Sequence, residues 1–150
     1  MAIDIKLEQD AATSLFDISF TNGDFTTVDS FDTSLQVSLF ADARATKSQV
    51  PRSELRRGWW GNQFSPDFPL YELGSKLWLL DQSRKTQSTL NNAIDFAKNA
   101  LQWLIDKGHA EGVEVTGAFV NEGIKLTIVI KRGNGIVETK YYDLWDNTGL

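Results

Sequence analysis

The segment Gln87-Ser-Thr-Leu-Asn-Asn-Ala-Ile-Asp-Phe-Ala-Lys-Asn-Ala-Leu-Gln-Trp-Leu-Ile-Asp-Lys107 decides the fold that this sequence predicts. Its apolar side chains recur at helical spacing without a break: Leu90, Ala93, Ile94, Ala97, Leu101, Leu104 and Ile105. Thr86 or Ser88 can cap its start, and Gly108 follows where helices commonly stop. We therefore expect one long amphipathic helix over residues 87–107.

Three β-rich runs follow this helix. They cover residues 113–120, 124–130 and 136–142, and glycine-containing turns at 121–123 and 133–135 join them. Strands separated by such short turns indicate an antiparallel meander. We expect one face of this sheet to pack on the long helix. An outer edge would keep unpaired backbone groups that could accept a strand from a partner.

The N-terminal half predicts strands followed by helices. Apolar residues alternate over 3–7 and recur over 15–20, and Thr21-Asn-Gly-Asp24 is a strong hairpin signal. Apolar residues at four-residue intervals predict a helix over about 31–45, and a leucine stripe predicts another over 70–80, weakened by Gly74. The predicted fold class is α+β in a single domain, 1–150. It has an N-terminal β hairpin, two to three helices including one long helix, and a C-terminal three-stranded antiparallel meander.

Composition excludes several classes of function. The chain has 150 residues, a formal net charge of −5 and no cysteine. The absence of cysteine rules out disulfides and thiolate metal sites, and the acidic balance argues against general binding to nucleic acid. No signal peptide and no apolar run of membrane-spanning length is visible. We found no phosphate-binding loop and no calcium loop, so we expect no metal and no cofactor.

The most unusual stretch is Arg52-Ser-Glu-Leu-Arg-Arg-Gly-Trp-Trp-Gly-Asn-Gln-Phe-Ser-Pro-Asp-Phe-Pro-Leu70. Proline and glycine break both helix and strand here, so an ordered loop pinned by its own aromatic side chains is expected. Trp59 and Trp60 should point to opposite sides of an extended backbone, one inward and one toward a neighbour. The loop could equally cap the domain's own core.

Positive charge gathers beside this loop. Between residues 44 and 57 a single acidic residue, Glu54, opposes five basic ones: Arg44, Lys47, Arg52, Arg56 and Arg57. These side chains either pair with carboxylates of the same chain or reach an acidic patch on a partner. Arginine suits both roles, because its planar group holds a carboxylate with two hydrogen bonds.

The hexapeptide Arg56-Arg57-Gly58-Trp59-Trp60-Gly61 resembles the signature of the Mu-like phage tail baseplate protein family. The likeness covers most of the chain, although the family more often has Asp where Asn62 stands. The family is in turn distantly similar to the sheath-initiator baseplate proteins of contractile tails, which are sometimes described as lysozyme-like. The resemblance implies a structural, non-enzymatic component of a bacteriophage or prophage tail baseplate.

That resemblance also implies partners and a location. The partners would be other baseplate, wedge and sheath proteins, with several copies arranged around the tail axis and no nucleic acid or membrane bound. The six residues 56–61 would form the partner-binding site. The protein would be made in the host bacterial cytoplasm and would end in the virion tail, where the sheet edge could template the first sheath ring.

Two alternatives remain from the sequence. A cell-wall glycan hydrolase needs only two carboxylates at the right separation, and many are scattered along the chain. His109, the only histidine, is expected to be an exposed loop residue, and no Gly-x-Ser-x-Gly elbow is present. A carbohydrate-binding module of the tail could instead use Trp59, Trp60 or Trp145 as sugar platforms.

Overall fold

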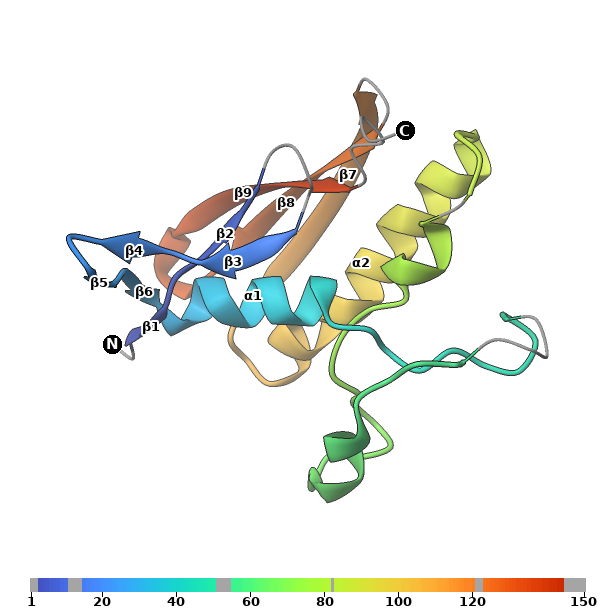
Figure 1. The fold of residues 1–150 in the computed structure, drawn as a ribbon, viewed down its shortest axis with the longest axis horizontal. Helices are drawn as coiled ribbons and strands as arrows, with labels where there is room; N and C mark the ends of the chain where they lie inside the picture. The colour runs from blue at the N-terminus through green and yellow to red at the C-terminus, as the bar shows by residue number, and fades with distance from the viewer. Residues whose placement is uncertain (1–2, 11–14, 51–54, 82, 121–122, 145–150) are drawn as a thin grey trace.

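The computed structural model describes residues 3–10, 15–50, 55–81, 83–120 and 123–144. Two α-helices pack against a three-stranded antiparallel sheet, and short N-terminal strands lie beside them (Figure 1). The predicted α+β class is therefore confirmed. Arg52 of the predicted basic cluster and Trp145, one of the possible sugar platforms, lie outside the described residues.

The sheet is the predicted meander. Its strands β7 (Gly112–Val120), β8 (Gly123–Lys131) and β9 (Val137–Leu144) are antiparallel neighbours in the order β7-β8-β9. Because side chains alternate along a strand, one face of β8 carries the core and the other is more accessible. The buried positions of β8 are Ile124, Leu126, Ile128 and Ile130.

The long helix is also confirmed, as α2 (Gln87–Asp106). Thr86 caps it, since its hydroxyl accepts a hydrogen bond of 3.1 Å from the amide of Thr89. The helix packs closely over β7 at Gly117, where a Cβ atom would lie 3.0 Å from Leu90 Cδ1. A glycine at this position of the sheet thus brings the helix axis nearer to the strand.

The first helix, α1 (Ser30–Phe40), begins as expected but ends earlier than residue 45. Asp29 caps it by accepting a hydrogen bond of 3.1 Å from the amide of Phe31. Ala41 is already extended, with φ −71° and ψ 146°. The helix stops here because the backbone after Ala41 pairs with residues far along the chain.

The predicted helix over 70–80 is wrong. Only Leu77–Leu80 is helical, as a short 3-10 helix. Gly74 adopts φ +97°, and a Cβ atom there would lie 2.3 Å from the carbonyl oxygen of Ala41. The next residue, Ser75, forms a parallel bridge with Asp42. Tertiary backbone pairing therefore replaces the helix that the leucine spacing favoured.

The N-terminal strands form three short ladders that meet at one junction. The pairs are β1 (Ile3–Ile5) with β6 (Thr27–Asp29), β2 (Leu7–Gln9) with β3 (Phe16–Ile18), and β4 (Phe20–Thr21) with β5 (Asp24–Phe25). At the junction Lys6 N–H donates to Thr26 O at 2.7 Å, and Thr26 N–H donates to Ser19 O at 2.9 Å. Ser19 N–H donates to Lys6 O at 3.0 Å and closes the cycle.

The predicted hairpin is the β4–β5 arm of this junction. Asn22 and Gly23 have positive φ angles of 52° and 82°, as the Asn-Gly signal requires. Phe20 and Phe25 face each other across the arm, with ring centroids 5.0 Å apart. The arm extends away from the helices (Figure 1).

The two outer strands of the sheet differ. The side-chain amide of Gln9 donates to Asp143 O at 2.9 Å, so the protein's own chain contacts the edge of β9. Within the described ranges β7 has one strand neighbour, β8. Acceptance of a partner strand at β7 stays a prediction. No helix in the described part of the chain is long and apolar enough to cross a membrane.

We expect Gly74→Ala to lower the free energy of unfolding by about 3 kcal/mol, because a left-handed backbone and a clash with Ala41 O act together. The matched control is Gly23→Ala, where φ is also positive but no atom lies within 4 Å of the added Cβ. This control should lose only about 1 kcal/mol. Urea denaturation measures both, and equal losses would contradict the close approach at Gly74.

Candidate partner-binding loop

The Trp-rich loop leaves the body of the protein at a set of backbone hydrogen bonds made by Ala41, Ala43 and Ala45, which we call the clasp. Ala43 N–H donates to Ser75 O at 2.9 Å, and Ser75 N–H donates to Ala41 O at 2.9 Å. Ala45 N–H donates to Arg56 O, also at 2.9 Å. The chain that enters and the chain that leaves the loop are therefore both paired to the strand-like segment after α1, and the loop projects from this base (Figure 1).

Arg57 faces the protein's own chain. Its guanidinium lies 3.0 Å from Asp42 Oδ2 and 4.4 Å from the centroid of the Trp78 ring. Trp78 is in turn fixed by a hydrogen bond of 2.8 Å from its indole N–H to Ala43 O. The ion pair is about half exposed and contributes about 1 kcal/mol at most, so its main effect is to orient the loop.

The other arginines are divided. Arg56 Nε donates to Ala45 O at 2.6 Å, so this side chain also braces the base of the loop. Arg44 is exposed; its guanidinium donates to Arg57 O at 3.5 Å, and its backbone lies close to Gly58. Internal pairing thus accounts for Arg56 and Arg57, while Arg44 and Lys47 present their charge to solvent.

Both glycines that flank the tryptophans are required by close packing. Gly58 has φ +100°, and a Cβ atom there would lie 2.8 Å from Arg44 Cβ. A Cβ atom at Gly61 would lie 2.3 Å from the Trp59 ring. The indole of Trp59 therefore lies directly over the backbone of Gly61.

Neither tryptophan is buried. Trp59 is 48% exposed and Trp60 73%, and their ring centroids are 6.1 Å apart. The expectation that the two rings point to opposite sides is not met, because a 3-10 helix over Trp60–Phe64 brings them together. Phe64, itself 73% exposed, packs edge-on against Trp60 at 5.8 Å.

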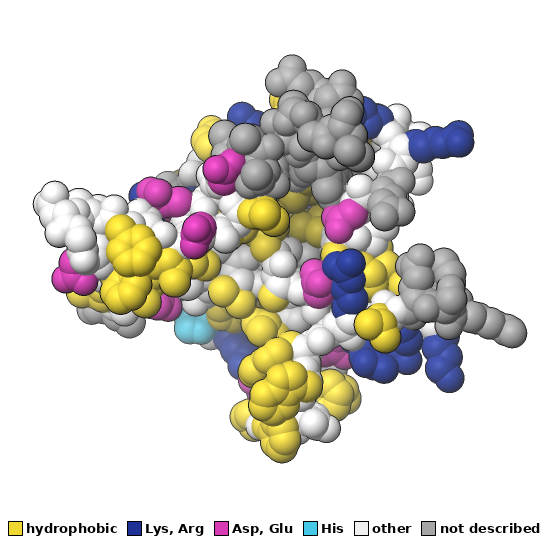
Figure 2. Space-filling view, viewed as in Figure 1, with side chains coloured by type: hydrophobic (Ala, Val, Ile, Leu, Met, Phe, Trp, Pro, Cys, Tyr) yellow, Lys and Arg dark blue, Asp and Glu magenta, His cyan; other side chains and the backbone are white. Residues whose placement is uncertain are grey.

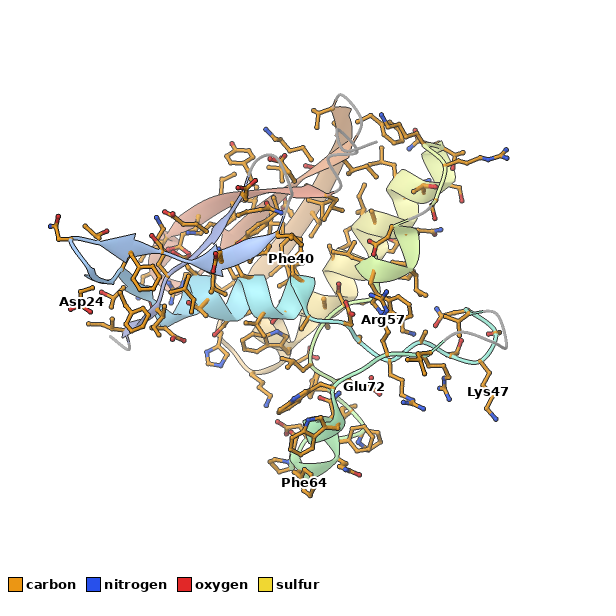
Figure 3. All side chains as sticks on the ribbon, viewed as in Figure 1. Asp24, Phe40, Lys47, Arg57, Phe64 and Glu72 are labelled. Carbon is orange, nitrogen blue, oxygen red and sulfur yellow. The ribbon has the colours of Figure 1, made fainter. Side chains whose placement is uncertain are left out.

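We call Trp59, Trp60, Phe64 and Phe68 the aromatic knob. It forms a protruding apolar surface with dark-blue basic side chains beside it (Figure 2). Phe64 lies near its far end (Figure 3). Folded proteins bury most of their tryptophan surface, so several exposed rings on one projection are unusual.

Asn62 holds the knob closed from inside. It is 7% exposed, and its side-chain Oδ1 accepts a hydrogen bond of 2.9 Å from the amide of Leu73. The backbone N–H of Asn62 donates a hydrogen bond of 3.2 Å to Trp59 O. This acceptor role needs an oxygen rather than a negative charge, so the neutral Asn62 side chain performs it.

A cleft of about 400 Å³ separates the knob from the helices. Residues of the knob and its return line one wall, and Ser38, Trp103 and Lys107 line the other. Tyr71 in this cleft donates a hydrogen bond of 2.6 Å to Asp106 Oδ2, which raises the pKa of the phenol and lowers the pKa of the carboxyl. Lys107 pairs with Asp67 across the same space.

Hydrogen bonds perturb three of the described carboxyl groups. The pKa is lowered at Glu8, Asp106 and Glu114, in each case mainly by a hydrogen bond from a neighbouring side chain. Within the described ranges no group of three or more His, Asp or Glu side chains could hold a metal ion. His109 is exposed, and its ring packs edge-on against Trp103 at 5.6 Å.

Comparison with known proteins identifies the family of this chain. Residues 31–137 match the family model described as "Phage protein GP46". The chain belongs to the phage protein GP46 family. It is 38% identical over 124 residues to baseplate protein gp46 of Escherichia phage Mu, covering 81% of this chain and 83% of that protein. It is also 38% identical over 87 residues to Mu-like prophage FluMu protein gp46 of Haemophilus influenzae, covering 58% and 56%.

The structure brings the six predicted site residues of this GP46-family chain together in one loop. It divides them by role: Arg56 and Arg57 brace the base, Gly58 and Gly61 permit close packing, and Trp59 and Trp60 face outward. Sequence reasoning noted Phe64 and Phe68 but missed their place in the knob. It also missed the buried anchor Asn62, for which a polar residue between aromatic ones was the only signal.

We expect Asn62→Ala to open the knob, because the Leu73 amide would lose its buried acceptor, an effect of about 1–3 kcal/mol. Amide hydrogen exchange at Leu73 measures this local opening even where global unfolding is unchanged. Asn62→Asp should keep Leu73 protected at neutral pH, because a carboxylate oxygen accepts the same bond. The surface control Gln63→Ala should leave it protected too. Equal protection in the Ala variant and the wild type would refute the anchoring role.

Proposed function

We propose that this protein is a structural component of a phage or prophage tail baseplate and that the aromatic knob is its principal docking surface. The family match and the Mu relative named as a baseplate protein support the first statement. The second rests on geometry: a clasped, internally anchored loop holds exposed indole and phenyl rings away from the body. The assembly partners are other tail proteins, and the protein works in the virion tail after synthesis in the host.

The observation that supports docking most directly is that the rings of the knob are exposed although hydrogen bonds hold the loop in place. Burying an apolar side chain of this size stabilises a protein by about 1.5–3 kcal/mol, and the knob leaves Trp60 and Phe64 largely in water. Preformed aromatic anchors lose little conformational entropy on binding, which is why Trp dominates the energetic centres of interfaces. The knob therefore suits a partner with an apolar pocket.

The rings are less suited to flat stacking on sugars. Trp59 and Trp60 are inclined by 48°, and Phe64 meets Trp60 at 81°, so the knob offers no extended planar platform. The ring geometry therefore favours docking on a protein over binding of sugars.

Trp60→Ala should leave folding intact and impair tail assembly. The side chain is 73% exposed, so we expect a change in unfolding free energy below about 1 kcal/mol. Loss of an interface anchor corresponds to about 2 kcal/mol or more, a roughly 30-fold weaker contact. The measurement is complementation of a phage that lacks this gene, read as infectious titre and as complete tails seen by electron microscopy.

Tyr141→Ala is the matched control, because Tyr141 is an aromatic side chain of similar exposure, 65%, on the sheet rather than the knob. It should assemble normally. If Trp60→Ala supports wild-type titres, the knob is not a docking surface. If purified protein instead degrades peptidoglycan with turnover that one carboxylate substitution abolishes, the structural role is wrong.

A further inference from the structure

A second exposed aromatic surface lies on the β4–β5 arm. Phe20 is 62% exposed and Phe25 49%, and the two rings pack as a pair on one side of the arm. The arm and the aromatic knob project from different parts of the molecule (Figures 1 and 2). Neither projection therefore covers the other within one chain.

The arm belongs to an acidic unit. The described residues 3–10 and 15–29 contain one basic residue, Lys6, and six acidic ones: Asp4, Glu8, Asp10, Asp17, Asp24 and Asp29. Glu8 pairs with Lys6 inside the unit. Asp24, at the turn of the arm, accepts a hydrogen bond of 2.8 Å from the amide of Phe25, a neutral donor that leaves the carboxylate charge in place.

The chain that leads into the knob is basic. The described residues 44–50 and 55–58 contain four basic residues, Arg44, Lys47, Arg56 and Arg57, and no acidic one. Asp42 balances Arg57, and Glu72 lines a small hollow of the knob together with Arg44. Arg44 remains exposed beside the aromatic rings. Lys47 lies farther along the loop, away from Phe64, and on the opposite side of the view from Asp24 in Figure 3.

We infer that the β4–β5 arm of one copy of this chain docks on the aromatic knob of a second copy. The two surfaces are complementary: the arm offers paired phenylalanines with the Asp24 carboxylate, and the knob offers exposed indoles with Arg44 beside them. The contact is heterologous, since it joins two different surfaces of identical chains. The inference rests on the proposed docking role of the knob and names its occupant.

The contact should be weak in solution and sensitive to salt. Both surfaces are small, and interfaces that bury less than about 1,200 Å² are usually transient. Exposed opposite charges are screened beyond about 10 Å at 0.1 M salt. Copies held side by side in a larger assembly would engage more fully, because their effective concentration rises.

Analytical ultracentrifugation of the full chain tests the contact through complementation. Wild-type protein should gain average mass as its concentration rises to the order of 500 µM, and should lose it in high salt. An arm variant, Phe20→Thr with Phe25→Thr, and a knob variant, Trp60→Ala with Phe64→Ala, should each remain monomeric. Thr retains a strong strand preference, so the arm should stay folded, as circular dichroism checks.

An equimolar mixture of the two variants should form dimers, because the knob variant keeps an intact arm and the arm variant keeps an intact knob. A contact between two copies of the same surface would not be restored in this way. Monomeric wild-type protein at every concentration overturns the inference. Association that neither variant weakens, or a mixture that stays monomeric while wild-type protein associates, overturns it as well.

Site-specific cross-linking locates the contact, since the chain has no cysteine of its own. Thr21→Cys on the arm and Gln63→Cys on the knob are exposed positions, and Ser88→Cys at the start of α2 is an exposed control. Oxidising a mixture of the first two variants should give a mixed disulfide dimer at least about 10-fold faster than either mixture with the control. Equal rates would refute the predicted pairing.

These outcomes separate the inference from the proposed function. Monomeric wild-type protein together with a Trp60→Ala assembly defect would leave the docking role standing with a different tail protein as occupant. Self-association through the arm and knob, without any effect of either variant on virions, would instead count against the baseplate role of the knob.

Discussion

The loop geometry depends on one short backbone pairing. After α1, Ala41 and Ala43 exchange hydrogen bonds with Ser75, and Ala45 is bonded to Arg56. This clasp ends the helix, replaces the following helix that leucine spacing favoured, and fixes the points where the loop leaves and returns. Gly74 makes it possible, because any side chain there would collide with Ala41 O. The knob is therefore bonded to the core where its chain enters and where it returns.

Predictions from the sequence were most accurate where a local residue pattern alone determines the secondary structure. Uninterrupted helical spacing fixed α2 within one residue, and Asn-Gly located the β4–β5 turn. It failed where residues distant in sequence compete for the same backbone groups, as at 41–45 and 70–80. Periodicity around Gly74 cannot reveal that Ser75 has a partner at Asp42, because that partner is set by tertiary pairing.

The candidate site shows the same division. The hexapeptide pointed to the loop that carries the exposed indoles, yet alternation along an extended chain wrongly separated the two rings. A 3-10 helix after Trp59 removes that alternation and gathers the rings, while Gly61 gives Trp59 room to lie over the backbone. The arginines were ambiguous from sequence alone. Only the positions of Asp42, Trp78 and Ala45 show that two of them brace the base.

Charge is distributed unevenly along the chain, which the net charge alone does not show. A formal charge of −5 suggests a uniformly acidic surface, but the described N-terminal strands alone carry six acidic residues against one lysine. The body and the knob are therefore close to neutral or locally basic. Exposed aromatic rings accompany each extreme. The two surfaces thus differ in charge and share exposed aromatic rings. They are formed by the Trp-rich loop and the β4–β5 hairpin, which the core does not need for its own packing.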